Sequence, residues 1–165
     1  MAAFSINSMK FILVTVGKIR EDFILKGINE YSYRIGRYAK LVFSPVKEER
    51  LIKGVKESLI LQKEGERILT KVPHDGLWVA MDRQGQEMNS LQHFEFINTQ
   101  AEIGIKKIYY LIGGPLGLSQ KVLKQSDRLL SLSRMTLTHE MSALLLLEQI
   151  YRYLNFMSGE KYHKG

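Results

Sequence analysis

The chain of 165 residues is 45% hydrophobic and 25% charged, which are the proportions of a folded globular protein of one domain. It contains no cysteine, and this excludes disulfide scaffolds, thiolate metal sites and cysteine nucleophiles. The 24 Lys and Arg residues exceed the 17 Asp and Glu residues and give a net charge of +7, which favours a polyanionic partner.

Strand-like and helix-like stretches alternate along the chain after a polar segment, residues 1–8, which we expect to be a disordered leader before a single domain at 9–165. In chain order, the pattern predicts a strand at 11–16, a helix at 20–37, a strand at 41–46, one long helix or two over 48–71, a strand at 77–81, a helix from 89 or 90 to 102, a strand at 107–112, a short helix from 119, a strand at 129–133 and a helix from 140 to 158.

This alternation is typical of parallel β-α units, so we predict an α/β fold with a single parallel sheet and helices on both faces. Ligands of such sheets bind beyond the carboxyl ends of the strands. The loops after Met81, Ile112 and Ser133 are therefore the places where we expect a site.

A glycine-rich turn, residues 113–119, joins an apolar strand to a helix start. Glycines let a ligand approach the backbone and leave amide groups free, which suits an adenosine, a carboxylate or a phosphate. The turn contains neither the dinucleotide fingerprint Gly-x-Gly-x-x-Gly nor a P-loop. A tight turn without a ligand is an equally good interpretation of these residues alone.

Residues 131–140 combine several hydroxyls with a cation, an imidazole and a carboxylate at a strand-to-helix junction. The Gly-x-Ser-x-Gly elbow of serine hydrolases is missing, so hydrolase chemistry is not indicated. Thr138 is expected to cap the last helix, with Glu140 in its first turn. The four histidines are scattered without metal-ligand spacing, and we expect no metal site.

The last helix is apolar on more than one side, which suggests that a second subunit covers part of it. Arg152 on this helix either pairs across that interface or faces a phosphate. The tail around Tyr162 and His163 could bind a nucleic acid, although frayed basic termini are common. The apolar runs are too short to span a bilayer, and we expect a cytoplasmic protein without membrane contact.

Three motifs in order, at 112–119, 130–139 and 148–152, resemble a known family. The segments 9–18, 63–69 and 162–164 agree with it, so the resemblance runs from Met9 to the C-terminus. It is to the RlmH family of SPOUT-class methyltransferases, which modify a pseudouridine of large-subunit ribosomal RNA. Two positions depart from the family pattern, because Thr138 replaces a proline and Ala143 replaces an arginine.

The resemblance implies an obligate homodimer with a deep trefoil knot in the C-terminal half, and S-adenosylmethionine bound in that knot. By matching motif positions, the implied cofactor pocket comprises Met81, Gly113, Leu132, Ser133, Arg134, Met135, Thr136 and Leu137. Backbone groups would hold the adenine and the methionine carboxylate, while the apolar side chains supply the walls.

The implied reaction is methylation of ring N3 of a pseudouridine in 23S ribosomal RNA, in the assembled ribosome. For this reaction we hypothesise that His163 helps to remove or accommodate the proton of N3. Tyr162 is expected to pack against the base or hydrogen-bond to it, and Arg152 to contact a substrate phosphate or stabilise the developing anion. The competing hypothesis is a basic RNA- or ribosome-binding module without catalysis, in which the glycine turn is purely structural.

Overall fold

The structure is a computed structural model that describes residues 8–159. Its elements are β1 (Lys10–Thr15), α1 (Asp22–Ile35), β2 (Lys40–Phe43), α2 (Glu57–Lys71), β3 (Leu77–Glu87), α3 (Ser90–Glu102), β4 (Lys107–Ile112), α4 (Gln120–Gln125), β5 (Arg128–Ser131) and α5 (His139–Met157). The predicted leader lies outside the described residues except for Ser8, and the predicted tail beyond residue 159 lies outside them as well.

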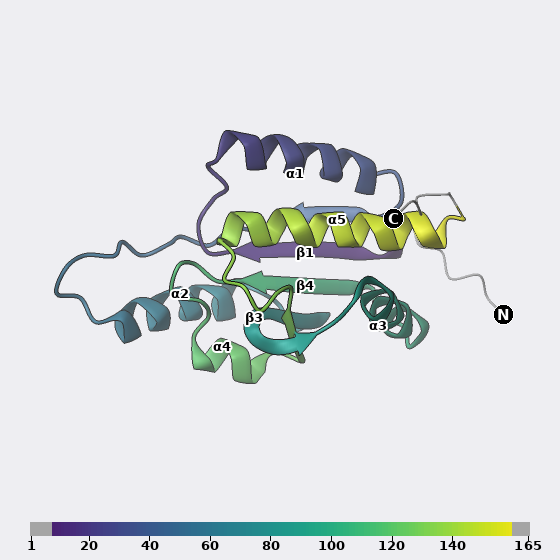
Figure 1. Cartoon of the computed structure of the whole chain (residues 1–165). Helices are drawn as coiled ribbons and strands as arrows, with labels where there is room; N and C mark the ends of the chain where they lie inside the picture. Colours follow the sequence, from purple (N-terminus) through teal and green to yellow (C-terminus); the bar gives the residue numbers. More distant parts are fainter. Residues whose placement is uncertain (1–7, 160–165) are drawn as a thin grey trace.

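The strands form one sheet in the order β2-β1-β4-β3-β5, and every pair of neighbours is parallel. The predicted α/β class is thereby confirmed. Because all strands run the same way, their carboxyl ends share one edge of the sheet (Figure 1). That edge carries the loops from which a ligand site can be built.

Helices cover both faces of the sheet, as the sequence predicts. Alternate residues of β1 show the division: Phe11 and Leu13 belong to a core cluster with α1, α3 and α5, whereas Ile12 and Val14 belong to a cluster with α2 and α4. Figure 1 shows α1 and α5 on one side of the sheet and α2 and α4 on the other. Strands buried on both faces explain why the sequence has continuous apolar runs rather than alternation.

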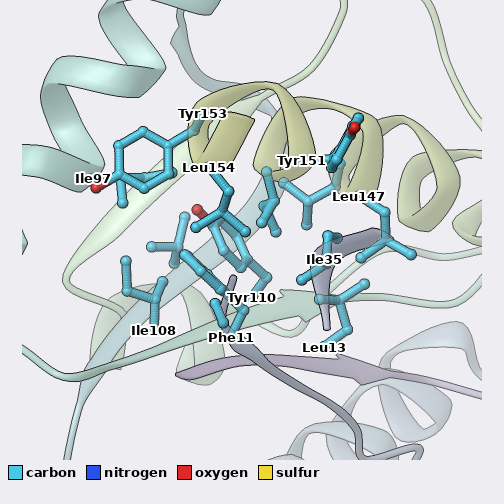
Figure 2. Close-up of a cluster of buried hydrophobic side chains, with 14 of the residues drawn as sticks. Phe11, Leu13, Ile35, Ile97, Ile108, Tyr110, Leu147, Tyr151, Tyr153 and Leu154 are labelled. Atoms are coloured by element: carbon cyan, nitrogen blue, oxygen red, sulfur yellow. The ribbon is translucent and has the colours of Figure 1, made fainter. Parts of the chain in front are cut away.

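The larger core cluster lies between the sheet and α5 (Figure 2). Phe11 and Tyr110 come from the sheet, and Leu147 and Leu154 come from α5; all four are fully buried. Burial of one such side chain stabilises the fold by roughly 1.5–3 kcal/mol. Ala143 is also fully buried here, so this turn of α5 faces the core.

The start of α5 is fixed by its own residues. Thr138 caps the helix and accepts a hydrogen bond from the amide of Met141 at 3.1 Å, as predicted. Glu140 is buried and accepts hydrogen bonds from the amides of Arg20 at 3.1 Å and Glu21 at 2.9 Å. The carboxylate therefore joins the first turn of α5 to the entry of α1 and satisfies two amides at that helix start.

The prediction of helix over 48–71 is wrong for its first part, because α2 begins only at Glu57 and residues 48–56 form an irregular loop. Gly54 has a φ of 93°, which interrupts any helix. Leu51 and Ile52 have the spacing of a helix face, but both side chains are exposed and do not pack against a core. The spacing alone could not reveal this.

The strand predicted at 77–81 is longer than expected, because β3 continues to Glu87 after a register shift. Leu130 of β5 pairs with Met81 and again with Gln86, so β3 folds around β5 at its carboxyl end. Gly85 permits this approach, since a Cβ at that position would lie 2.6 Å from the carbonyl carbon of Leu129.

Gly65 weakens α2 as an isolated helix but lets it pack onto α4. A Cβ at this position would lie 3.0 Å from the Cβ of Ser119 and closer still to its Oγ, which caps α4. We expect Gly65→Ala to lower the free energy of unfolding by about 1–3 kcal/mol, although alanine is the better helix former. Chemical denaturation measures this change, and Gly65→Ala/Ser119→Gly should recover most of the loss. An unchanged or more stable Gly65→Ala protein would contradict the packing.

Candidate active site

A cavity of about 480 Å³ lies beyond the carboxyl ends of β3, β4 and β5. The three loops in which the sequence predicts a site all contribute to it. The predicted cofactor residues that line it are Met81, Gly113, Leu132, Ser133, Met135, Thr136 and Leu137. Its volume lies in the range of small-ligand and cofactor pockets, about 300–1,000 Å³.

The glycine turn forms one wall of the cavity. Gly117 donates its amide to the carbonyl of Gly114 at 2.9 Å and has a φ of 81°, which closes the turn. A Cβ at Gly113 would lie 2.8 Å from the amide nitrogen of Leu118 and closer still to the Gly117 carbonyl. Glycine at 113 is therefore required by the turn itself, which lines the cavity with residues 113–118.

The loop after β5 forms another wall and is held by its own hydroxyl groups. Ser131 donates from Oγ to the carbonyl of Ser133 at 3.0 Å, and the amide of Met135 donates to Ser133 Oγ at 3.0 Å. These serines shape the loop, which explains their spacing without a role as nucleophiles. Leu132 and Leu137 give this wall its apolar surface.

Arg134 is the one predicted cofactor residue whose side chain leaves the cavity. Its Nε donates to Glu87 at 2.6 Å, and this pairing raises the pKa of the exposed guanidinium. The ion pair fastens the loop to the end of β3. If Arg134 contributes to the predicted cofactor pocket, it does so through its backbone groups.

Sequence reasoning missed several lining residues, the nearest being Asp82, Arg83 and Gln84 directly after Met81. Asp82 accepts a hydrogen bond from the amide of Gln84 at 2.8 Å, which forms a turn. An aspartate just after a buried strand is a recognised signal for such a turn and could have identified this part of the wall. Leu61, Gln120 and Ser142 also line the cavity, and only the tertiary fold brings them there.

His139 offers a polar atom that the described residues do not satisfy. It lines the cavity, yet its buried Nε2 has no hydrogen-bond partner in residues 8–159, and the Glu140 carboxylate is 3.9 Å away. A buried polar atom without a partner is costly, and a polar ligand atom would remove that cost. The glycine turn, the apolar wall and this imidazole together fit a nucleoside-type ligand such as S-adenosylmethionine.

Arg152 lies outside the cavity lining. It pairs with Glu148 at 2.5 Å, and Gln149 donates to the other oxygen of Glu148 at 2.6 Å. Ser90 of α3 in turn donates to Gln149 at 2.7 Å. Tyr162 and His163, the other two predicted catalytic residues, lie outside the described residues.

Residues 8–159 contain no group of three or more His, Asp or Glu side chains placed to hold a metal ion. None of the helices in this part of the chain is long and apolar enough to cross a bilayer.

The fold and site define the class of α/β proteins with a parallel sheet and a ligand-sized cavity at the carboxyl ends of the strands, where such sheets bind their ligands. The family described as "Predicted SPOUT methyltransferase" matches residues 9–163. The chain belongs to this family of SPOUT methyltransferases. A deep trefoil knot, which the resemblance implies, stays a prediction.

Curated relatives match 94% of this chain over their whole length. Proteins named "Ribosomal RNA large subunit methyltransferase H" are 39% identical in Carboxydothermus hydrogenoformans, 41% in Desulfotalea psychrophila and 41% in Halothermothrix orenii. Among solved structures, a probable methylase family protein from Haemophilus influenzae shares the fold with a TM-score of 0.53 at 14% identity. That likeness covers 97% of this chain and 72% of the other.

A second hollow of about 350 Å³ adjoins the cavity across Leu130–Leu132, and His93 of α3 lines it. His93 Nε2 lies 3.1 Å from the hydroxyl of Tyr110. Burial lowers the pKa of His93 from 6.5 to about 4, so the imidazole is neutral at physiological pH.

The lowered pKa predicts a pH-dependent stability. Between pH 6.5 and about 4 the unfolded chain binds a proton at His93 that the folded chain does not bind. We therefore expect this residue to contribute stability above pH 6.5 and to lose on the order of 2–3 kcal/mol of it as the pH falls to about 4. Urea unfolding of the wild type and His93→Gln over this range measures the effect. The variant should show the shallower pH dependence, and equal slopes would contradict the assignment.

Proposed function

We propose that this chain transfers the methyl group of S-adenosylmethionine to ring N3 of a pseudouridine in 23S ribosomal RNA, in the assembled ribosome. The observation that carries the proposal is the single cavity at the strand ends that the glycine turn and the loop after β5 both line. The names of the curated relatives support the substrate class. The net charge of +7 suits a ribosomal partner in the cytoplasm.

The cavity residues hold the cofactor in this proposal. Backbone groups of Gly113 and of residues 132–137, Arg134 included, bind the adenine and the methionine carboxylate. Met81, Leu132 and Leu137 form the apolar walls. S-adenosylmethionine supplies, when bound, an electrophilic sulfonium methyl group.

The remaining chemistry is to align a ring nitrogen with that methyl group and to remove its proton. The N3–H group lies between two carbonyls and is mostly protonated at neutral pH, so a base and a nearby positive charge accelerate the reaction. His163 accepts the proton and Tyr162 packs against the base or hydrogen-bonds to it. Arg152 contacts a substrate phosphate or stabilises the developing anion.

The proposed active form is a homodimer. Arg152 lies outside the cavity of its own chain, so it serves the site through a partner subunit, together with the tail that carries Tyr162 and His163. Leu145, Phe156 and Met157 of α5 support a second subunit, because these apolar side chains are exposed in the single chain.

Gly113→Ala tests the cofactor site. The new Cβ would displace the Gly117 carbonyl and reshape the wall, so we expect calorimetry to give an affinity for S-adenosylmethionine at least about tenfold lower, a loss of ~1.4 kcal/mol. Gly36→Ala is the matched control, since Gly36 ends α1 away from the cavity with a φ of -58°, which alanine adopts without strain, and its affinity should stay close to wild type. A Gly113→Ala protein with wild-type affinity would contradict this site.

The reaction is tested with labelled S-adenosylmethionine and ribosomes from a strain that lacks the modification, beside naked ribosomal RNA. We expect label on a pseudouridine of the large-subunit RNA, located by nuclease digestion and mass spectrometry. If the intact protein neither binds S-adenosylmethionine nor transfers label to RNA, this result would favour a non-catalytic RNA- or ribosome-binding module.

The same assay tests the proposed base. Loss of a general base costs about 10²–10⁴-fold in rate, and we expect His163→Ala to fall in this range while its cofactor affinity is unchanged. A variant that binds cofactor and methylates at the wild-type rate would remove the role of His163.

A further inference from the structure

A third depression, an open groove of about 620 Å³, lies between the chain that leaves β2 and the second half of α2. We call it the β2-α2 groove. Four cationic side chains line it, namely Lys47, Lys63, Arg67 and Lys71, against the single carboxylate of Glu66. No step of the proposed methyl transfer uses these residues.

The walls of the β2-α2 groove are joined by specific contacts. Arg67 donates to the carbonyl of Lys47 at 2.9 Å and forms an ion pair with Glu49. The amide of Glu49 donates to Oε1 of Glu64 at 2.9 Å, and burial raises the pKa of this Glu64 carboxyl. Lys71 donates to the carbonyl of Pro45 at 2.5 Å. The groove is thus a preformed feature, with its cations held on two fixed walls.

Not all of this positive charge is neutralised within the chain. Lys63 is 4.0 Å from Glu49, which Arg67 already engages. The side chain of Lys47 is exposed and makes no hydrogen bond or ion pair to any residue in 8–159. Lysines on an open groove attract phosphates, whose counterions they displace.

One end of the β2-α2 groove, at Val46 and Lys47, lies at the same edge of the sheet as the cofactor cavity. Val46 pairs with Val16 beyond the carboxyl ends of β2 and β1, and the cavity lies at the ends of the next strands. Two strand spacings separate β2 from β4, about 10 Å. Helix α2 is a wall of both depressions, with Leu61 on the cavity and Lys63 on the groove.

We infer that the β2-α2 groove binds the phosphate backbone of the ribosomal RNA strand beside the target nucleotide. The inference rests on the proposed function and adds to it the surface that positions the substrate. Phosphate contacts of this kind fix the register of a nucleic acid without reading its bases. The groove therefore supplies affinity and orientation, while the cavity supplies the chemistry.

The test compares Lys47→Ala/Lys63→Ala with a control, Lys40→Ala/Lys106→Ala, that removes the same charge from exposed lysines at the amino edge of the same sheet. Co-sedimentation with ribosomes lacking the modification gives the affinity at several KCl concentrations. Two lost phosphate contacts should weaken binding about 10- to 30-fold near ~0.15 M salt and reduce the slope of log K against log salt by roughly 1.5–2. Affinity for S-adenosylmethionine should be unchanged, and the control should bind ribosomes as the wild type does.

Wild-type ribosome affinity in the groove variant would overturn the inference while leaving the methyl transfer intact. An equal loss in the control would overturn it too, because only net charge would then matter. Weaker binding with an unchanged salt slope would point to a ribosomal protein instead of a phosphate backbone, and would also overturn it. A wild-type protein that binds cofactor but methylates no ribosomal RNA would overturn the proposed function, and the groove's assignment to that RNA with it.

Discussion

Backbone segments approach one another without intervening side chains at two points beside the cavity, and the site depends on both. Gly85 lies against β5, where a Cβ would be 2.6 Å from the carbonyl carbon of Leu129. Gly113 lies against the backbone of Gly117 and Leu118. Only glycine allows such approaches. The first contact joins the end of β3 to β5 and the second closes the turn after β4, so main-chain packing shapes two parts of the cavity's surroundings.

The fold class was predictable because buried parallel strands have an unmistakable composition. Phe11 and its apolar neighbours face helices on both sides, so the run shows no alternation. The predicted secondary structure is wrong where the apolar pattern of the sequence does not correspond to burial in the fold. Leu51 and Ile52 have helical spacing but no core to face. The continuation of β3 to Glu87 is polar, because its pairing with β5 uses backbone groups that any residue provides.

Much of the candidate site could also be predicted, since the carboxyl ends of parallel strands limit where a ligand binds. The glycine turn and residues 131–137, apart from Arg134, do line one cavity. What the sequence could not reveal are residues brought there by tertiary packing, such as Leu61 of α2 and Gln120 of α4. The knot came from the resemblance alone, because periodicity carries no information about threading.

The double pairing of Leu130 has a consequence for how the protein is made. Segment 128–131 is the edge strand of the sheet, and its Leu130 pairs with β3 at Met81 and, after a register shift, again at Gln86. Contacts here join distant parts of the chain, as in the hydrogen bond from the Trp78 amide to Asp127 across a separation of 49 residues. Such late, long-range pairing closes a large loop and folds slowly. During synthesis β5 is the last strand to emerge, and the loop after it lines the cavity, so the cavity takes shape only when nearly the whole chain has left the ribosome.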